Sequence, residues 1–230
     1  MLRAVSLTKI IGSFSLSIDD LHIESPGVYG LIGPNGCGKS TTAKMLCGIL
    51  RPGGGKIETS LDRRDITMIS QKPYIMDDTV HSNLAYPLKL RGIKSADVLC
   101  DEYLGKIGFL ERKNQRARGL SGGERQKLAL LRAMIFNPRL IILDEAMTDL
   151  DLDSLDLFEN MILERQKTDP VIWIIISHQL AHIRRLCGYI FFMTEGRLVA
   201  EGPADELLES PNPLVRRYLK HEVLEAGPEK

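Results

Sequence analysis

The feature that most constrains this chain of 230 residues is a glycine-rich segment at residues 33–40, Gly-Pro-Asn-Gly-Cys-Gly-Lys-Ser. It fits the phosphate-binding loop pattern, in which Gly, four residues and Gly-Lys-Ser/Thr follow a strand and open a helix. The apolar run 28–32 before it predicts a buried strand. Residues 40–50 after it predict a helix that ends at Pro52. We therefore expect a strand, a loop and a helix in the order that such a loop requires.

The residue types in this segment suit phosphate chemistry. Glycines let the backbone turn tightly and bring its N–H groups close to phosphate oxygens, and the helix N-terminus adds partial positive charge. Lys39 can reach the β- and γ-phosphates, and the Ser40 hydroxyl can ligate Mg²⁺. Taken alone, the motif also fits a glycine-rich turn that binds nothing. The candidate nucleotide-binding residues here are Gly33, Pro34, Asn35, Gly36, Cys37, Gly38, Lys39, Ser40 and Thr41.

The composition is that of an ordinary soluble globular protein, with 43% hydrophobic and 26% charged residues. Thirty basic and thirty acidic side chains balance, so nothing favours nucleic acid or an anionic membrane surface. No apolar run approaches the roughly 20 residues of a transmembrane helix, and no signal-peptide core is present. The four cysteines form no CxxC pair or metal-ligand spacing, which indicates reduced thiols in the cytoplasm. If the protein works at a membrane, we expect it to dock onto another protein there.

The hydrophobic pattern predicts an α/β chain with one helical insertion. Continuous apolar runs are typical of parallel strands buried on both faces. The predicted strands are 2–9, 14–24, one around Ile57, 66–70, 140–143, 171–176, 189–193 and 197–200. The predicted helices are 80–90, 95–107, 121–136, 151–167, 179–186, 203–209 (with Pro203 as its first residue) and 212–225. Residues 77–136 therefore form a helical subdomain inserted into an α/β core, in pieces broken by Pro87 and glycines, and residues 227–230 form a frayed tail.

An acidic pair, Asp144 and Glu145, follows the apolar run 140–143. An acid at the end of such a strand is the companion of a phosphate loop, because it places a carboxylate beside Mg²⁺. Two adjacent acids at a buried strand end are costly unless a cation or hydrogen bonds compensate. We expect Asp144 to support Mg²⁺ and Glu145 to polarise an attacking water. The alternative is a solvated junction between strand and loop.

The most specific stretch is residues 120–126, Leu-Ser-Gly-Gly-Glu-Arg-Gln. Ser121 and Glu124 form a Ser-x-x-Glu capping box that opens a helix. The box does not explain Gly122 and Gly123, because glycine costs about 1 kcal/mol relative to alanine within a helix. Two glycines in the first turn let another group lie close to the backbone, and an exposed helix N-terminus is a phosphate receptor.

Together these motifs resemble the ATP-binding subunit of ATP-binding cassette (ABC) transporters. Six features occur in that family's order and cover nearly the whole chain. They are the phosphate loop, Gln71 as the Q-loop glutamine, residues 120–124 as the signature, Asp144-Glu145 as the Walker B end, residues 148–151 as a variant D-loop and His178 as the switch histidine. The resemblance implies a single ABC ATPase domain over 1–230, a P-loop NTPase of ABC type. Its parts are an α/β core (about 1–76 and 137–226) with an N-terminal antiparallel β subdomain, and the inserted helical subdomain (about 77–136).

The resemblance also implies site roles for ATP and Mg²⁺. The implied catalytic residues are Glu145, His178, Gln71 and Lys39, and the implied metal ligands are Ser40, Gln71 and Asp144. His178 positions the γ-phosphate and water, although a lone histidine is more often structural. Two cassettes pair head to tail, so each ATP lies between one subunit's phosphate loop and the partner copy's Ser121, Gly122 and Gly123.

Four positions depart from the family pattern. Ile11 stands where an aromatic side chain usually stacks on adenine, with Phe14 as a possible substitute. Ala146 and Asp149 replace the usual D-loop proline and alanine. Cys37 lies within the loop and near a helix N-terminus, which predicts a lowered thiol pKa and a reactive thiol, with a small buried filler as the alternative. The reactive thiol predicts that a maleimide blocks ATP hydrolysis and that Mg-ATP protects.

The implied function is ATP hydrolysis that energises transmembrane permease subunits from the cytoplasmic side of the membrane, as a peripheral subunit and in a homodimer. Residues 83–92 resemble the helical insert of importer cassettes, which favours import and allows for a substrate-binding protein. The alternative is a soluble ABC-type ATPase outside any transporter, as in iron–sulfur-cluster assembly. Only about 80 residues separate Ser40 from Ser121, too few for the coiled coils of chromosome-maintenance ATPases, and translation-type proteins carry two cassettes. We expect no nucleic-acid partner, and no residue specifies the transported substrate.

Overall fold

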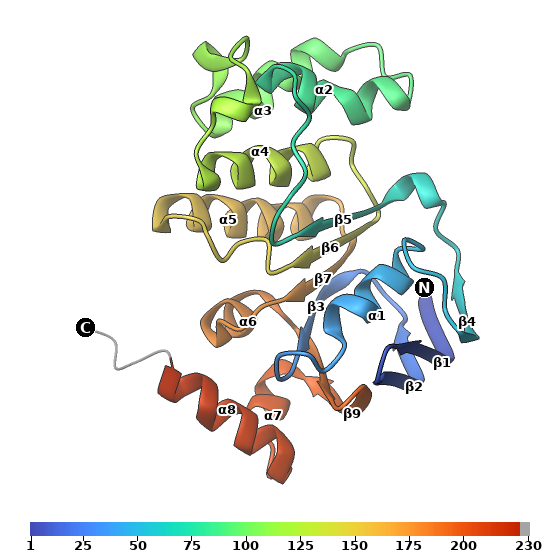
Figure 1. Ribbon diagram of the computed structural model, residues 1–230. Coiled ribbons are helices and arrows are strands. Elements are labelled where there is room, and N and C mark those ends of the chain that lie inside the picture. The colour runs from blue at the N-terminus through green and yellow to red at the C-terminus, as the bar shows by residue number, and fades with distance from the viewer. Residues whose placement is uncertain (226–230) are drawn as a thin grey trace. The chain divides into compact units, whose positions relative to one another are not determined.

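The computed structural model describes the backbone of residues 1–225 and the side chains of residues 1–221. The chain divides into two compact units (Figure 1). The first unit contains residues 1–68, 139–145 and the chain from 165 onward, and the second contains residues 69–138 and 146–164. The frayed tail predicted at 227–230 lies outside the described residues.

A three-stranded antiparallel sheet opens the first unit, in the order β2-β1-β4. Its strands are β1 (Leu2–Ile11), β2 (Phe14–Ile23) and β4 (Gly54–Thr59). The β1–β2 hairpin is in register from Leu2 opposite Ile23 to Ile11 opposite Phe14. Gly12 takes a left-handed φ of 59° in the connecting turn. The N-terminal antiparallel β subdomain is thereby confirmed.

A six-stranded sheet has the order β5-β6-β7-β3-β8-β9. Its central strands β6, β7, β3 and β8 run parallel, and β9 is antiparallel to β8. All residues of β6 and β7 are buried, which explains their continuous apolar sequences. The strands are β3 (Gly27–Ile32), β5 (Ile66–Ser70), β6 (Leu140–Asp144), β7 (Ile172–Ile176), β8 (Tyr189–Thr194) and β9 (Arg197–Pro203).

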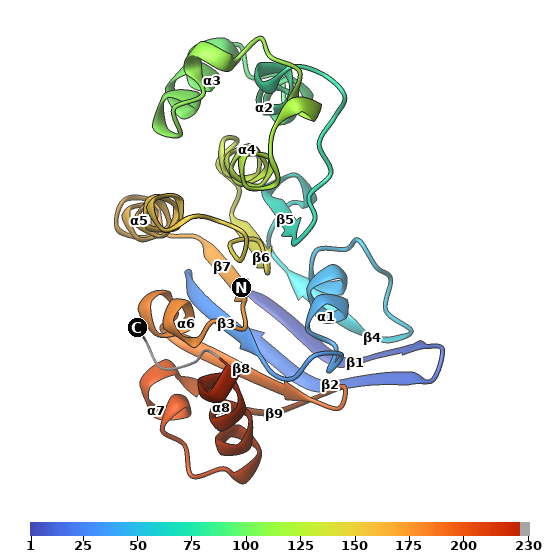
Figure 2. The same cartoon turned by 60° about the vertical axis from the view of Figure 1, so that its left-hand side comes forward.

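Helix α1 (Lys39–Leu46) packs between the two sheets, because its Ala43, Met45 and Leu46 belong to a core cluster that also contains residues of β1, β2, β3, β6, β7 and β8. Helices α6, α7 and α8 lie on the other side of the larger sheet (Figures 1 and 2). The ring of Tyr218 in α8 packs 5.4 Å from the Phe192 ring of β8. The helices are α6 (Leu180–Leu186), α7 (Ala204–Leu208) and α8 (Pro213–Glu225).

Helix α1 ends at Leu46, four residues before the predicted end. Gly48 takes a left-handed φ of 68°, and its N–H donates to the Met45 carbonyl while that of Ile49 donates to Lys44. This is a Schellman motif, which satisfies the last carbonyls of the helix. The prediction of a helix up to residue 50 was wrong because it placed the stop at Pro52 and overlooked Gly48.

The second unit is helical apart from the end of β5. Its helices are α2 (Val80–Leu90), α3 (Ala96–Lys106), α4 (Gly122–Met134) and most of α5 (Leu152–Thr168). The last four residues of α5, 165–168, belong to the first unit. Helix α2 packs against α3 and α4 (Figure 2). Pro87 lies within α2 and does not break it, contrary to the sequence prediction. The predicted subdomain limits, 77–136, remain a proposal.

Pro203 ends β9 and is the N-cap of α7, so the prediction that it would be the first helical residue was wrong by one position. The ψ of Pro203 is 140°, which is extended, because Pro203 pairs with Tyr189 of β8 and so remains part of the strand. Among the described residues, no helix combines the length and apolarity needed to span a bilayer.

Candidate ATP-hydrolysing site

The phosphate loop connects β3 to α1, as the sequence predicted. Pro34, Asn35 and Gly36 are exposed at its tip, whereas Gly33 is buried with a left-handed φ of 146°. A Cβ on Gly33 would lie 2.0 Å from the carbonyl oxygen of Met193, a distance no side chain can accept. Gly33 is therefore required both by its backbone conformation and by the close approach of β8.

The loop leads directly into the N-terminus of α1. Gly38 is the N-cap, with a left-handed φ of 109° and no side chain to cap the helix. The first N–H groups of a helix have no intrahelical partner, so without a side-chain cap they are available to a ligand. With the partial positive charge of the helix end, this gives a site suited to phosphate oxygens.

Lys39 is buried, with 5% of its surface exposed, and its ammonium lies inside the loop. Nζ donates to the carbonyl oxygens of Gly33 at 2.6 Å and Pro34 at 3.0 Å. A buried ammonium needs such acceptors. The loop therefore holds a positive charge in its interior, where a phosphate can exchange for the carbonyl contacts.

Ser40 and Asp144 meet across the first unit. The Ser40 hydroxyl donates to Asp144 Oδ1 at 3.0 Å. Burial raises the pKa of the Asp144 carboxyl, and the Ser40 hydrogen bond partly opposes this. A buried carboxylate and a neighbouring hydroxyl are two oxygen ligands of the kind that a small hard cation such as Mg²⁺ prefers.

The two oxygens also suit Mg²⁺ in number. Mg²⁺ is usually held by one or two carboxylates, waters and substrate phosphates, not by a cage of protein ligands. Within residues 1–225 no group of three or more His, Cys, Asp or Glu side chains is arranged to hold a metal ion. The residues present thus fit a metal that is bound together with a nucleotide.

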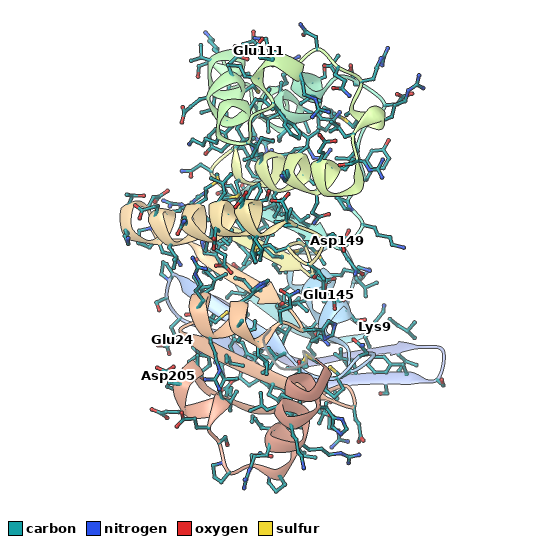
Figure 3. The ribbon with its side chains drawn as sticks, turned by 90° about the vertical axis from the view of Figure 1, so that its left-hand side faces the viewer. Lys9, Glu24, Glu111, Glu145, Asp149 and Asp205 are labelled. Atoms are coloured by element: carbon teal, nitrogen blue, oxygen red, sulfur yellow. The ribbon has the colours of Figure 1, made fainter. Side chains whose placement is uncertain are left out.

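Glu145 and His178 form the second pair of the site. Glu145 follows β6 and His178 follows β7, and these strands are parallel neighbours with Asp144 opposite Ile176. Because carboxyl ends of parallel strands meet at one edge, the two side chains come together. His178 Nε2 lies 2.5 Å from Glu145 Oε1. Figure 3 shows Glu145 at this end of β6.

Glu145 has an unusual backbone. Its φ is 55°, in the left-handed region that non-glycine residues rarely occupy. Its N–H donates to the Ile176 carbonyl at 2.9 Å, which ties it to β7. Strained residues of this kind cluster at functional sites, where surrounding contacts hold them in place.

A cavity of about 240 Å³ lies in the first unit, between the phosphate loop, Glu145 and the end of the β1–β2 hairpin. Its polar side includes Lys39, Ser40 and Glu145, and its apolar side includes Ile11 and Phe14, which face each other across the β1–β2 hairpin. Phe14 also lines an adjoining cavity of about 610 Å³ beside α8. The Phe14 ring is thus open to a ligand, and it rests against Gly38, where an added Cβ would lie 3.1 Å from it.

Cys37 contradicts the prediction of a reactive thiol. It is buried, with 4% of its surface exposed, and its Sγ points towards Gly33. Burial raises the pKa of the Cys37 thiol, which outweighs the opposing effect of the Lys39 charge. The alternative of a small buried filler is the one that the structure supports.

Ser121, Gly122 and Gly123 open α4 in the second unit. The predicted capping box is confirmed: Ser121 Oγ accepts from the Glu124 N–H at 3.3 Å, and Glu124 Oε2 accepts from the Ser121 N–H at 2.8 Å. Ser121 and Gly122 are exposed, and a Cβ on Gly122 would meet no atom within 4 Å. This helix end is open to another molecule. Gln71, also in this unit, follows β5 and is exposed.

The structure thus brings together Lys39, Ser40 and Asp144, and separately Glu145 and His178, within the first unit. Gln71 and residues 121–123 belong to the second unit. Sequence reasoning missed the contribution of Met193, whose carbonyl packs on Gly33 and whose Sδ accepts from the Thr42 hydroxyl at 3.7 Å. No local pattern marks Met193, because only the sheet order brings β8 beside the loop.

Comparison with known families decides the identity of this fold. Residues 16–148, which carry the phosphate loop, the signature and the acidic pair, match the family described as ABC transporter. The chain belongs to that family. As an ABC ATPase it binds and hydrolyses ATP.

Relatives of known function support the assignment to the ABC transporter family. The chain is 36% identical to the tungstate uptake system ATP-binding protein TupC of Peptoclostridium acidaminophilum over 84% of this chain and 92% of that protein. It is 27% identical to the methionine import ATP-binding protein MetN of Geobacillus kaustophilus over 96% of this chain and 71% of that protein. It is 29% identical to the phosphate import ATP-binding protein PstB of Saccharolobus solfataricus over 88% of each chain.

A solved structure confirms the ABC ATPase fold. It is a dimeric post-hydrolysis state of the ATP-binding cassette MJ0796 bound to ADP and Pi. The TM-score is 0.79 at 21% identity, and the match covers 89% of this chain and 99% of that chain.

Proposed function

We propose that this ABC ATPase powers an importer, in which two copies hydrolyse Mg-ATP and drive transmembrane permease subunits. The observation that carries the ATPase chemistry is the meeting of the Ser40–Asp144 and Glu145–His178 pairs with Lys39 at one sheet edge. The three relatives named above are uptake or import subunits, which supports import. Because they serve tungstate, methionine and phosphate, likeness alone does not select a substrate.

Each residue of the site would contribute to the binding or to the hydrolysis of ATP. Lys39 moves from the Gly33 and Pro34 carbonyls to the β- and γ-phosphates, and the loop N–H groups bind the remaining oxygens. Ser40 and Asp144 would hold Mg²⁺, and we propose Gln71 as a further ligand. When bound, Mg²⁺ neutralises charge on the phosphates.

The Glu145 carboxylate accepts a hydrogen bond from the attacking water and orients it towards the γ-phosphorus. His178 holds that carboxylate in position through Nε2 before ATP binds, and Nε2 then donates to the γ-phosphate instead. Phe14 supplies the aromatic contact for the base, since Ile11 has no ring. Both line the cavity that contains Lys39 and Ser40.

The exposed end of α4 acts on a second nucleotide. Ser121, Gly122 and Gly123 present a helix N-terminus with an open approach, which suits the γ-phosphate of an ATP held by a partner copy. We therefore propose a head-to-tail homodimer at the cytoplasmic side of the membrane, bound peripherally through permease subunits, with a substrate-binding protein as a further partner.

Isolation of the tagged chain from its native membranes tests the transport assignment. The proposal predicts retention of an integral membrane subunit through detergent extraction. The alternative, an ABC-type ATPase of iron–sulfur-cluster assembly, predicts a complex made of soluble proteins alone. A soluble complex with full ATPase activity would therefore contradict the transporter role while leaving the ATP chemistry intact.

A further inference from the structure

The segment 146–151, which follows Glu145, packs along helix α4 in the second unit (Figure 3 labels Asp149 within it). The first contact is backbone packing. A Cβ on Gly123 would lie 3.4 Å from the Asp149 carbonyl oxygen, so this carbonyl lies beside the first turn of α4. The middle of the segment therefore lies next to the start of the helix that carries the signature.

The second contact is a buried hydrogen bond. Gln126 has 3% of its surface exposed, and its Nε2 donates to the Ala146 carbonyl oxygen. Ala146 is itself buried. Because an unpaired buried carbonyl is costly, this bond fixes the backbone at the residue that immediately follows Glu145.

The third contact is an ion pair. Lys127 Nζ lies 2.9 Å from Asp151 Oδ2. Asp151 Oδ1 accepts from the Ser154 N–H at 2.9 Å and from the Ser154 hydroxyl at 2.6 Å, which caps the start of α5. The two carboxylate oxygens thus have separate tasks, one towards α4 and one towards α5.

The three α4 residues share one helix face. Positions 123, 126 and 127 are three and four apart, which is the spacing of neighbours on a helical surface. Gln126 and Lys127 bind the two ends of the segment, at Ala146 and Asp151. Gly123 lies beside its middle, at Asp149. We call these three contacts the α4 clamp.

The clamp bears on Glu145 through the chain itself. The left-handed φ of 55° at Glu145 is costly for a non-glycine residue and needs support on both sides. The Glu145 N–H bond to Ile176 supplies it on one side. On the other side, the hydrogen bond from Gln126 to the Ala146 carbonyl holds the peptide group that joins Ala146 to Met147.

We propose that Gln126 and Lys127 are positioning residues for ATP hydrolysis, which keep the backbone after Glu145 in its active conformation. This inference rests on the proposed role of Glu145 as the residue that polarises water. The clamp also ties that segment to the helix whose first residues face the partner's nucleotide. Movement of the signature helix would therefore alter the hydrolytic site of the same chain.

The ion pair can be removed with little risk to folding. Asp151 is 61% exposed and Lys127 19% exposed at the side chain, so solvent screens the pair and its contribution to stability is small. The pair borders a cavity of about 350 Å³, which leaves room for substitutions. Asp151→Asn keeps an oxygen that can cap α5, and Lys127→Met keeps the length of the side chain.

Steady-state ATPase kinetics of the purified full chain test the clamp. Lys127→Met and Asp151→Asn should each lower kcat about tenfold, with KM for ATP within about twofold of wild type, because displacement of a positioned group costs rate more than binding. The double variant should lose no more than either single variant. Lys127→Arg should restore most of the rate, and Gln126→Leu should lower kcat at least as much as Lys127→Met.

Ser154→Ala is the matched control. It removes the hydroxyl that donates to Asp151 Oδ1 but leaves the Lys127 pair, so it should retain kcat within about twofold. Wild-type kcat in Lys127→Met and Asp151→Asn would overturn the inference, as would kcat losses that follow Tm across all variants, Ser154→Ala included. Glu145→Gln, measured beside them, separates the two claims: if it is inactive while the clamp variants are fully active, only the clamp is wrong, and if it hydrolyses ATP normally, the proposed role of Glu145 is wrong.

Discussion

His178 Nε2 and Glu145 Oε1 lie 2.5 Å apart at the ends of two adjacent parallel strands, β7 and β6. The contact joins the two side chains that hydrolysis is proposed to need. It holds the carboxylate in one orientation before a nucleotide arrives. A group that is oriented in advance loses less freedom in the transition state.

His178→Ala removes this contact and leaves the phosphate loop untouched. We expect kcat for ATP hydrolysis to fall about a hundredfold, while the Kd for ATP changes by less than about threefold, because the side chain positions and does not provide the main phosphate contacts. Stopped-flow binding and steady-state turnover measure the two quantities. A large loss of ATP affinity with kcat preserved would show that His178 acts in binding instead.

Gly33→Ala should abolish nucleotide binding. The new Cβ would lie 2.0 Å from the Met193 carbonyl, at a φ of 146° that alanine rarely adopts, so the loop must move. Gly36→Ala is the matched control, because a Cβ there meets no atom within 4 Å although φ is 75°. Isothermal titration with Mg-ATP should show a much larger loss at Gly33, and equal losses at the two positions would be contrary to this account.

Cys37 should resist thiol reagents in the folded protein. Its burial excludes the reagent, and the raised pKa of its thiol leaves little thiolate at neutral pH. We expect maleimide to leave ATPase activity unchanged and mass spectrometry to find Cys37 unmodified until the protein is unfolded. Rapid labelling of Cys37 that Mg-ATP prevents would support the reactive thiol instead.

The capping box of the signature helix should make stability depend on pH. The Arg112 guanidinium, followed by the Ser121 N–H, lowers the pKa of Glu124 from 4.5 to about 2. The folded state therefore binds fewer protons than the unfolded state, so this stabilisation is present above about pH 4.5 and is lost as the pH falls towards 2. Urea unfolding at several pH values should show this loss in wild type and not in Glu124→Gln. Parallel curves for the two proteins would contradict it.

Much of the fold follows from the sequence because its signals are local. The apolar runs at 140–143 and 171–176 predicted buried parallel strands, and the structure has β6 and β7 at Leu140–Asp144 and Ile172–Ile176. The capping box at Ser121 was visible because its two partners are three residues apart. The pairing of Glu145 with His178 could be expected only from the resemblance, since it depends on which strands are neighbours.

What the sequence did not reveal depends on packing between distant segments. Cys37 is buried because it belongs to a core cluster that also contains residues of β2, β3 and β8, which its place in the loop does not reveal. The α4 clamp joins residues 20 to 26 positions apart, through the side chains of Gln126 and Lys127 and the backbone of Gly123. A pattern search finds Gln126 and Lys127 only as polar residues on a partly buried helix.

Glu145→Gln tests whether Glu145 activates the water that attacks ATP. The neutral amide keeps the size of the side chain but removes the carboxylate that accepts the proton. Single-turnover hydrolysis and ATP-dependent dimerisation should be measured on the same sample. We predict unchanged ATP affinity, a stable dimer with ATP, and a fall of at least about a thousandfold in hydrolysis rate. Hydrolysis at the wild-type rate would contradict the claim.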